Sequence, residues 1–585
     1  MLDYYGPMSL PNRLLTLALV AACACGSAFG AAPASETPDN SSLDGELFYQ
    51  MLVSEMSARA GDNGSAYALM LNAARKANSS RLYERAVEIA LRARSGESAL
   101  DAAQAWARAF PSSREANRFH LQILLGLNKI PETQEPIKRE LASLAPTERA
   151  VAISLLPRYF SRTTDKKLAA RVLESSLATE LPNRVTGPNA WAAIGALRLQ
   201  AEDMDGALDA ARRGAALDPA AEGPILLATA LISPKAPAAE VMVRTYLESK
   251  PEADVRMAYA RSLINAQRYA EAYSQAQTLS IEKPDFADVW LMRGSLELQN
   301  ANLPMAESSL KAYVALNPPS DEADHGSAMS RGLVQAYLLL SQVAEQGHKL
   351  DDAKGYLQKI ESPTDALRVQ RRYAGILARQ GKIDEARMVI RAVPELQASD
   401  ALDKLNAEVQ LLRDSRQYAA AYQLLQEAVA RYPDDTELVY DQAMIAEKIG
   451  KPDEMESLLR KVMQAKPDYH HAYNALGYSL ADRNIRLTEA RELIRKALEF
   501  APNDPFIIDS LAWVEFRSGN SAEALRLLTG AFQVRPDAEI AAHLGEVLWA
   551  AGHRDRASAI WKEGVGLNPN NETLLETMRR LRGNP

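Results

Sequence analysis

A fixed order of large apolar, small and polar positions recurs along this chain. The stretch YNALGYSLADRNIRLTEARELIRKALEFAPND occupies residues 473–504, and IDSLAWVEFRSGNSAEALRLLTGAFQVRPD occupies residues 508–537. Both stretches run through the same succession of large apolar, small, large apolar and small residues before they end near a proline. A skeleton that returns directly after itself indicates a repeat architecture in which each copy is one supersecondary unit.

Prolines set the register of this repeat. Five of them are separated by 34, 35, 34 and 33 residues: Pro433, Pro467, Pro502, Pro536 and Pro569. Upstream, the series continues through Pro219, Pro251, Pro284 and Pro318. A proline has no backbone N–H and cannot prolong a helix, so it fixes the turn into the next unit. A period of this size predicts a solenoid of helical hairpins.

Small residues hold fixed places between the prolines. Gly294 follows Trp290 by four residues, and Ala306 follows Gly294 by twelve. The corresponding places are taken by Gly477 and Ala490, thirteen residues apart, in one unit and by Gly545 and Ala557, twelve apart, in the last, and in these two units Ile494 and Trp561 follow four residues later. Two antiparallel helices approach closely only where small side chains face each other. We therefore expect these residues to build the hairpins and not to bind ligands.

The pattern resembles the tetratricopeptide repeat, whose signature is W-x₂-L-G-x₂-Y followed by Ala, an aromatic or Leu, Ala and Pro. The resemblance implies an all-α fold, a tetratricopeptide-repeat superhelix (α-solenoid) of about 13 to 15 helical hairpins without a sheet. The strong repeats cover residues 186–318 and 333–569. The predicted remaining parts are degenerate helical repeats (47–185), a loop insertion (319–332), and a capping helix with a tail (570–585).

The N-terminus differs in composition from the rest. LLTLALVAACACGSAFGA is an apolar run too short for a stable membrane anchor, so residues 1–30 are predicted to be an export signal and 31–46 a flexible linker. VAAC, ending at Cys23, resembles a bacterial lipobox, whereas AFG before Ala31 suits ordinary signal peptidase. Both cleavage sites stay open. We expect a periplasmic protein, anchored to the outer membrane in the version in which Cys23 is lipidated.

Composition excludes several functional classes. The 585 residues carry a formal net charge of −8, and no Lys/Arg-rich stripe is present to neutralise phosphates, which argues against nucleic acid as a partner. Both cysteines, Cys23 and Cys25, lie in the leader, so the folded body has neither disulfide nor cysteine-metal chemistry. No metal and no cofactor are expected.

A search for catalytic chemistry finds no phosphate loop, dinucleotide fingerprint, H-E-x-x-H or G-x-S-x-G motif. His470 and His471 are adjacent on a predicted helix, where neighbours point about 100° apart and cannot easily share a metal. SSLK, at 308–311, matches S-x-x-K formally, but Leu310 falls on a core position, which argues against Ser308 as a nucleophile. Asp434 and Asp435 follow a repeat proline and are expected in a turn that caps the next helix. The sequence predicts no enzyme.

The first helix of each hairpin is the place to look for binding residues. In tetratricopeptide arrays, positions 2, 5, 9, 12 and 13 of that helix line a concave face. Aromatic residues and arginine dominate protein-binding hot spots. The alternative is that Trp513 and Phe516 pack against the neighbouring hairpin. The candidate partner-binding residues are Tyr478, Asp482, Asp509, Trp513, Arg517 and Trp549.

Two further inferences concern the partner. Arg368, Arg371 and Arg379 are predicted to form a small basic patch that could hold an acidic segment. His471, Asn474 and Tyr478 match poorly the Lys/Asn clamp that chaperone-type repeats use on a C-terminal carboxylate, so acidic chaperone tails are excluded as ligands.

The last 110 or so residues show a more specific sequence resemblance. YNALGYSLADRNIRLTEARELIRKALEFAPNDPFIIDSLAWVEFRSGN and EIAAHLGEVLWAAGHRDRASAIWKEG resemble a group of exported proteobacterial repeat proteins. That group includes the outer-membrane lipoprotein that binds a periplasmic carboxyl-terminal processing protease and presents cell-wall hydrolases to it. The resemblance implies a non-catalytic scaffold with protein partners, such as that protease and its substrates.

Alternatives to this role remain open at the level of sequence. One is an assembly factor for exported polysaccharide or outer-membrane components. The other is an enzyme with an unrecognised site in the N-terminal region, which has no clustered His, Cys or Ser-base arrangement to support it.

Overall fold

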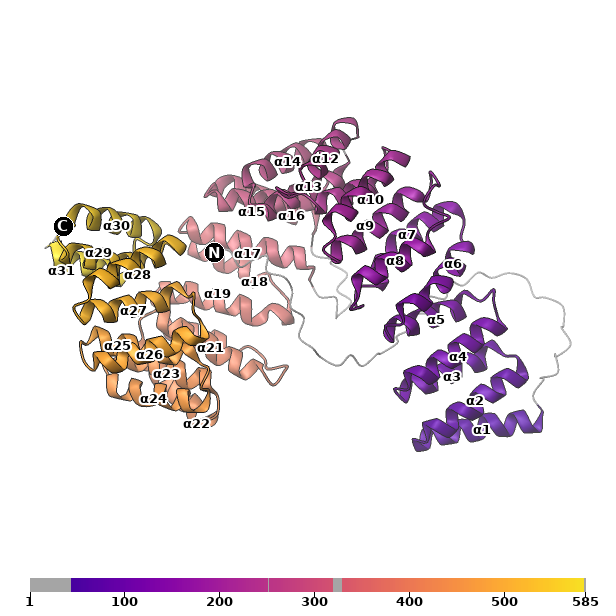
Figure 1. Cartoon of the computed structure of the whole chain (residues 1–585), viewed down its shortest axis with the longest axis horizontal. Coiled ribbons are helices and arrows are strands. Elements are labelled where there is room, and N and C mark those ends of the chain that lie inside the picture. The colour runs from indigo at the N-terminus through magenta and orange to yellow at the C-terminus, as the bar shows by residue number, and fades with distance from the viewer. Residues whose placement is uncertain (1–43, 251, 319–328, 583–585) are drawn as a thin grey trace. The chain divides into compact units, whose positions relative to one another are not determined.

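The computed structural model describes residues 44–250, 252–318 and 329–582, and in these ranges it is entirely helical (Figure 1). Thirty-one α-helices and two short 3₁₀ helices make up the described residues, which contain no strand. Successive helices contact one another as hairpins. The all-α solenoid of hairpins predicted from the sequence is confirmed.

Two compact units divide the chain between Ala258 and Tyr259, inside α13 (Ala253–Asn265). The helices of the first unit that precede α13 are α1 (Gly45–Ala60), α2 (Asn63–Ala77), α3 (Ser80–Arg92), α4 (Gly96–Ala109), α5 (Arg114–Gly126), α6 (Gln134–Ala142), α7 (Pro146–Tyr159), α8 (Lys166–Ser176), α9 (Gly187–Gln200), α10 (Met204–Leu217), α11 (Glu222–Ala230) and α12 (Pro237–Ser249). The 3₁₀ helix η2 (Ile130–Thr133) precedes α6.

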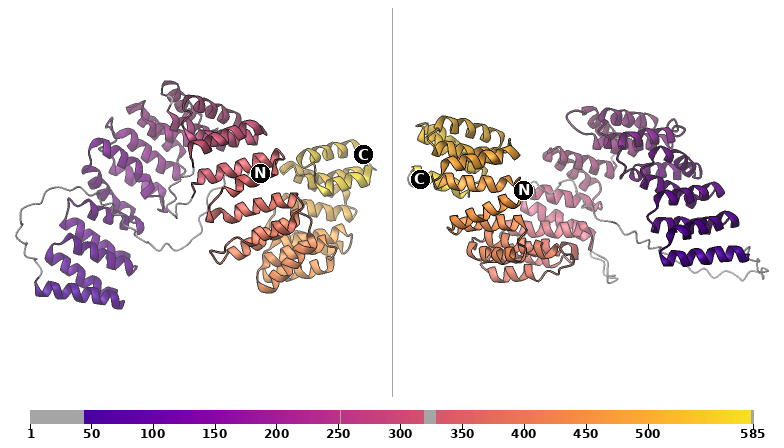
Figure 2. Two further views of the ribbon diagram at one scale, coloured as in Figure 1. Left: turned by 180° about the vertical axis from the view of Figure 1, so that it is seen from behind. Right: turned by 60° about the horizontal axis from the view of Figure 1, so that its bottom comes forward.

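The second unit begins at Tyr259, within α13, and also consists of helices (Figure 2). Its helices are α14 (Tyr269–Glu282), α15 (Ala287–Gln299), α16 (Leu303–Leu316), α17 (Arg331–Gln346), α18 (Leu350–Gln358), α19 (Ala366–Arg379), α20 (Ile383–Arg391), α21 (Asp400–Asp414), α22 (Tyr418–Arg431), α23 (Thr436–Lys448), α24 (Pro452–Ala465), α25 (His470–Asp482), α26 (Leu487–Phe500), α27 (Pro505–Arg517), α28 (Ser521–Val534), α29 (Ala538–Ala550), α30 (Arg554–Leu567) and α31 (Glu572–Arg582). The 3₁₀ helix η3 (Pro363–Asp365) precedes α19.

Glycines mark the closest approach of the two helices in a hairpin, as the spacing predicts. A Cβ added at Gly477 of α25 would lie 2.5 Å from Ile494 Cγ1 and 2.9 Å from the Ala490 carbonyl oxygen on α26. A Cβ added at Gly294 of α15 would lie 2.6 Å from Leu310 Cγ on α16. These contacts are shorter than carbon atoms tolerate, so the absence of a side chain is what lets the helices meet.

Aspartates after the repeat prolines begin several first helices. The Asp435 carboxylate accepts hydrogen bonds from the backbone N–H groups of Glu437 and Leu438, and Asp504 does the same for α27. These bonds satisfy amides that have no partner inside the helix. The capping role predicted for the acidic pair at 434–435 therefore falls to Asp435.

The early hairpins are irregular. α7 packs mainly against α9, while α8 contacts α6, η2 and α9, so α7 and α8 do not form a standard hairpin. At the other end, α31 covers α29 and α30, where the sequence places a capping helix. The predicted leader with Cys23 and most of the predicted linker and loop insertion lie outside the described residues; α17 begins at Arg331.

Candidate binding surface

The residues predicted to bind a partner lie on three successive first helices. α25 carries Tyr478 and Asp482, α27 carries Asp509, Trp513 and Arg517, and α29 carries Trp549. Three of them, Tyr478, Asp509 and Trp513, contact one residue that the sequence analysis did not single out, His543 of α29. Asp482 and Arg517 contact Trp513. Trp549 lies apart from them.

His543 is the centre of a buried polar cluster. Its side chain is 2% exposed, and its Nδ1 atom lies 2.8 Å from Asp509 Oδ2 and 3.0 Å from Oδ1. On the other side of the ring, Nε2 lies 3.2 Å from the Tyr478 hydroxyl. Both ring nitrogens are therefore satisfied, and three first helices are joined through one imidazole.

Burial and charge act on His543 in opposite directions. Burial alone would lower its pKa, but the Asp509 carboxylate, through its charge and its hydrogen bond, raises the pKa above the ordinary value, and Glu539 and Glu546 add to this. The Asp509 carboxylate thus stabilises the imidazolium in place of the water that burial removes. The cluster is a structural bond between repeats, and its ring is not accessible to a ligand.

Trp513 belongs to the same cluster and is only 3% exposed. Its ring stacks on His543 with centroids 4.4 Å apart, and its Nε1 atom donates a hydrogen bond to Asp482 Oδ1 at 3.3 Å. Of the two interpretations left open by the sequence, Trp513 follows the one in which it packs against a neighbouring hairpin. Asp509, at 5% exposure, is equally enclosed.

Asp482 and Arg517 remain at the surface of the cluster. Asp482 is exposed and Arg517 is half-buried. Arg517 donates a hydrogen bond to the Asp482 carbonyl oxygen at 3.2 Å, and its guanidinium carbon lies 5.8 Å from the centre of the Trp513 ring. A partner can reach the Asp482 carboxylate and the outer edge of Arg517 without displacing the core.

Trp549 forms a second aromatic position near the end of α29. Its ring is half-buried and lies 5.5 Å from the fully buried ring of Trp561. The Arg554 guanidinium covers it at 5.1 Å. An aromatic ring held between a core tryptophan and an arginine is a rigid, partly accessible contact site.

Carboxylates give this surface an acidic character. Desolvation raises the pKa of Glu447 on α23 and of Glu539 on α29. Burial also raises the pKa of the Tyr478 phenol, and nearby carboxylates, Asp482 first among them, raise it further. Asp482 and Glu539 are both exposed, so a cation can reach their carboxylates. The surface therefore favours a positively charged partner segment.

The predicted basic patch on α19 is mostly neutralised. Arg379 forms an ion pair with Glu345 of α17, and Arg368 lies 3.7 Å from Asp365. Arg371 is exposed. Two of the three guanidinium groups already have carboxylates beside them, which leaves less charge for an acidic segment than the sequence suggested.

The remaining chemical motifs show structural contacts. Lys311 of the SSLK stretch forms an ion pair with Glu307 at 2.6 Å, and Ser308 is exposed. The rings of His470 and His471 lie 4.1 Å apart, but no group of three or more His, Cys, Asp or Glu side chains in the described residues could hold a metal ion. Among the same residues, no helix has the length and apolar character that crossing a bilayer requires.

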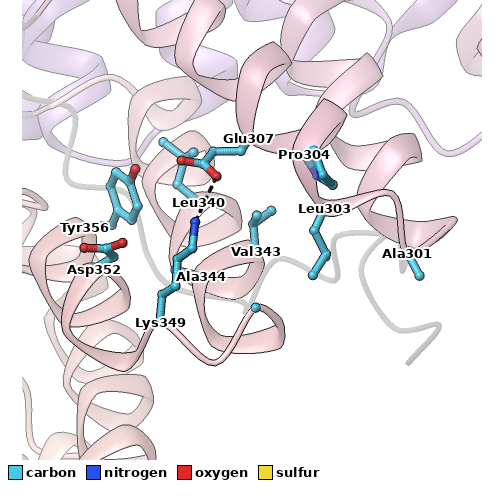
Figure 3. A pocket seen from close by; sticks show the side chains of 11 residues that line it. Ala301, Leu303, Pro304, Glu307, Leu340, Val343, Ala344, Lys349, Asp352 and Tyr356 are labelled. Atoms are coloured by element: carbon cyan, nitrogen blue, oxygen red, sulfur yellow. Dashed lines mark ion pairs between the residues drawn. The ribbon is translucent and has the colours of Figure 1, made fainter.

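A depression of about 430 Å³ lies between α16 and the α17–α18 hairpin (Figure 3). Leu303, Leu340 and Val343 contribute apolar wall, and Glu307 and Lys349 face each other across 3.8 Å. The two charges compensate each other, so the depression suits an apolar side chain better than a charged cofactor.

Comparison with known proteins agrees with this architecture. The profile of the tetratricopeptide repeat family matches residues 257–321, 406–461 and 440–505. The chain contains tetratricopeptide repeats. A TPR repeat-containing protein of Pseudomonas aeruginosa is 35% identical over 248 residues, which are 42% of this chain and 42% of that protein. The human protein O-mannosyl-transferase TMTC1 is 26% identical over 199 residues, which are 33% of this chain and 22% of that protein.

The chain thus spans less than half the length of these curated relatives. Among solved structures, a tetratricopeptide repeat protein from Parabacteroides merdae covers 43% of this chain and 99% of its own, with 16% identity and a TM-score of 0.34. The Cut9–Hcn1 hetero-tetramer of the APC/C covers 92% of this chain and 96% of its own, with 11% identity and a TM-score of 0.30. Tetratricopeptide repeats serve as protein-interaction scaffolds, and this function is what the repeats imply here.

Proposed function

We propose that this protein is a non-catalytic scaffold of the bacterial cell envelope that holds a protein partner on the first helices of its C-terminal repeats. The observation that carries the proposal is that α25, α27 and α29 bear both buried packing residues and accessible residues that the packing does not need. Gly477 and Trp513 are enclosed by the fold, whereas Asp482, Arg517 and Trp549 keep accessible surface that the packing of the hairpins does not use.

The side chains on that surface indicate what kind of partner segment it can bind. The exposed carboxylates of Asp482 and Glu539 favour a segment that brings Lys or Arg side chains, and Trp549 offers a flat ring for an apolar or cationic group. The finer role follows from the resemblance of the last repeats to exported adaptor proteins. In that role the scaffold brings a periplasmic carboxyl-terminal processing protease to cell-wall hydrolase substrates.

The location in the envelope is part of the proposal and rests on the apolar run before residue 31. Mass spectrometry of the mature N-terminus checks it. A chain that begins at an acylated Cys23 is anchored to a membrane, and one that begins at Ala31 is a periplasmic protein without the anchor. An intact leader on protein recovered from the cytoplasm contradicts export.

Affinity capture from envelope extract tests the binding surface. The test variant combines Asp482→Asn, Arg517→Ala and Trp549→Ala; asparagine keeps an acceptor for the Trp513 indole. The matched control changes an acid, a base and an aromatic residue on α26, the second helix of its hairpin: Glu499→Gln, Lys496→Ala and Phe500→Ala. These three side chains are exposed.

We expect the control to capture the same proteins as the parent, and the test variant to lose at least one of them. Equal capture by all three proteins places the binding surface elsewhere. If the lost protein is a carboxyl-terminal processing protease, its rate of hydrolase cleavage should rise when the parent scaffold is added and should rise less with the test variant. Recovery of polysaccharide or outer-membrane assembly components instead supports the assembly-factor role.

A further inference from the structure

The first helix of the array exposes a continuous apolar face. On α1, Phe48 is 54% exposed, Tyr49 64%, Leu52 47% and Met56 62%. The opposite side of the helix packs against α2. Leu47 is buried there, and the Ser54 hydroxyl donates a hydrogen bond to the Ala66 carbonyl oxygen of α2 at 2.6 Å. α1 therefore has apolar side chains both on the side that packs against α2 and on the side that faces away from it. The terminal helix of a solenoid usually has a polar outer side.

The positions of this face within the repeat can be compared with the equivalent positions of other first helices. Ser54 lies nine residues before α2 begins, as Gly545 lies nine residues before α30 begins. Counted from these positions, Tyr49, Leu52 and Met56 of α1 correspond to Ile540, His543 and Val547 of α29, which are all buried. The same positions are buried in two other first helices: Ala190, Ala193 and Leu197 of α9, and Val289, Met292 and Leu296 of α15.

In later repeats these positions pack against the preceding hairpin, as the contact of His543 with Asp509 of α27 shows. On α1 the same face is turned outward. A solenoid needs a polar outer face on its terminal repeats. The residues that lead into α1, AAPASETPDNSS at 31–42, contain no large apolar side chain to cover it. With the predicted leader removed, the face therefore calls for a helix from another source.

Polarity and charge indicate which helix can cover the face. The C-terminal end of the array is polar, because α31 carries the exposed residues Arg579 and Arg580, so head-to-tail stacking would press an apolar face against charge. The face of a second α1 is apolar as well. Asp44 and Glu46 lie at the start of α1, where Lys76 of α2 forms an ion pair with each, and Arg59 lies in the last turn of α1. Two carboxylates beside one ammonium leave this end acidic, so two such helices in antiparallel orientation bring opposite charges together at both ends.

We propose that α1 is an interface between two copies of this chain, which pack α1 against α1 antiparallel about a two-fold axis near Leu52. Phe48 and Met56 lie one turn before and one turn after Leu52, so the axis places Phe48 of one copy beside Met56 of the other. Contacts between methionine sulfur and an aromatic ring are favourable. Such an interface is isologous and closes at two subunits.

Sedimentation velocity of the purified chain tests the association. We expect a dimer at tens of micromolar, and a monomer for Leu52→Glu at the same concentration. Val241→Glu is the matched control, because Val241 of α12 is 62% exposed and lies outside the face; this variant should stay dimeric. Circular dichroism of both variants should equal that of the parent. A monomeric parent, or equal effects of the two substitutions, overturns the proposal.

Disulfide trapping tests the axis. With Cys23 and Cys25 replaced by serine, Leu52→Cys introduces a single thiol that the axis brings beside its own copy. Mild oxidation should yield a cross-linked dimer, and Val241→Cys should not. Equal cross-linking of the two variants contradicts the geometry.

Other occupants of the face give different results. A parent that is monomeric and floats with phospholipid vesicles, while Leu52→Glu does not, assigns the face to a membrane. A monomeric parent whose envelope partner is lost in Leu52→Glu assigns it to a different protein. Either result refutes self-association, and neither depends on the C-terminal surface proposed above.

Discussion

His543 and Asp509 are joined across two consecutive first helices, with 2.8 Å between Nδ1 and Oδ2 and both side chains buried. They are 34 residues apart, which is one repeat. The same separation joins other polar pairs in the described residues: Tyr67 with Asp101, Glu345 with Arg379, and Glu546 with Arg580. One repeat length is thus one of the separations at which polar side chains connect neighbouring hairpins.

The first prediction concerns the pH dependence of stability. The folded-state pKa of His543 is raised, so folding favours its protonated form. The corresponding part of the free energy of unfolding is complete below the unfolded-state pKa, about 6.5, and is lost as the pH rises through the folded-state value. We expect the urea midpoint of the parent to fall as the pH is raised from about 6.5.

His543→Gln is the control for this prediction, because glutamine keeps a hydrogen-bond donor and does not titrate. Its midpoint should change less over the same pH range. Asp509, Glu539, Glu546 and Tyr478 face the ring and remain in the variant. The same slope in parent and variant assigns the pH dependence to other groups.

A second prediction concerns the hairpin contacts. Gly477→Ala places a Cβ against the Ala490 carbonyl oxygen and Ile494, and should lower the free energy of unfolding by about 1–3 kcal/mol. Gly530→Ala on α28 is the matched control, since an added Cβ there meets no atom within 4 Å. Alanine favours the helix, so the control should gain about 0.5–1 kcal/mol. Chemical denaturation measures both, and a gain in both variants would mean that helix propensity, and not packing, decides the effect at Gly477.

The third prediction separates structure from binding in the predicted site. Trp513→Ala removes a buried ring and should cost about 3–5 kcal/mol of stability. Arg517→Ala removes a half-buried side chain and should cost less than about 1 kcal/mol. Thermal unfolding followed by circular dichroism measures the difference. If Trp513→Ala leaves the melting temperature unchanged, the ring is accessible, contrary to its position in the structure.

A fourth prediction concerns Glu297 of α15, which is 2% exposed. Its carboxylate lies 3.0 Å from Arg293 Nη2 and accepts hydrogen bonds from the Ser309 hydroxyl at 2.6 Å and the Tyr273 hydroxyl at 3.0 Å. Glu297→Ala removes the acceptor that these three donors share, leaves the buried Ser309 hydroxyl and the half-buried Arg293 guanidinium without it, and should cost about 3–5 kcal/mol.

Glu307→Ala on α16 serves as the comparison for Glu297→Ala. Its partner Lys311 is exposed, and surface ion pairs contribute about 0–1 kcal/mol. Urea unfolding of the two variants should separate them clearly. Similar midpoints would mean that burial does not set the value of these ion pairs.

The sequence was sufficient for the parts of the fold that repeat. Gly477 opposite Ile494 and Asp435 as a helix cap follow from local spacing, because each depends on residues within one hairpin or one turn. His543 was missed as a single histidine in an apolar helix. Its signal was Asp509, one repeat earlier, which only a comparison of charged residues at the repeat length would have shown.

The burial of Trp513 could not be derived in the same way. Position 9 of a first helix faces the concave side, but whether it stays open depends on how strongly the array curves. Here Asp482 from the preceding first helix accepts a hydrogen bond from the Trp513 indole, and His543 from the following one stacks on its ring. Curvature arises from small rotations summed over several hairpins, which no single repeat specifies.

The bond between Tyr478 and His543 has a consequence for how this array can change in length. Solenoids grow when a hairpin is duplicated, which is harmless as long as each hairpin touches only its neighbours. Tyr478 of α25 reaches His543 of α29 past the intervening helix α27. A duplication inside this span would part the two residues, so lineages of this protein should gain and lose hairpins on either side of it and keep one hairpin between them.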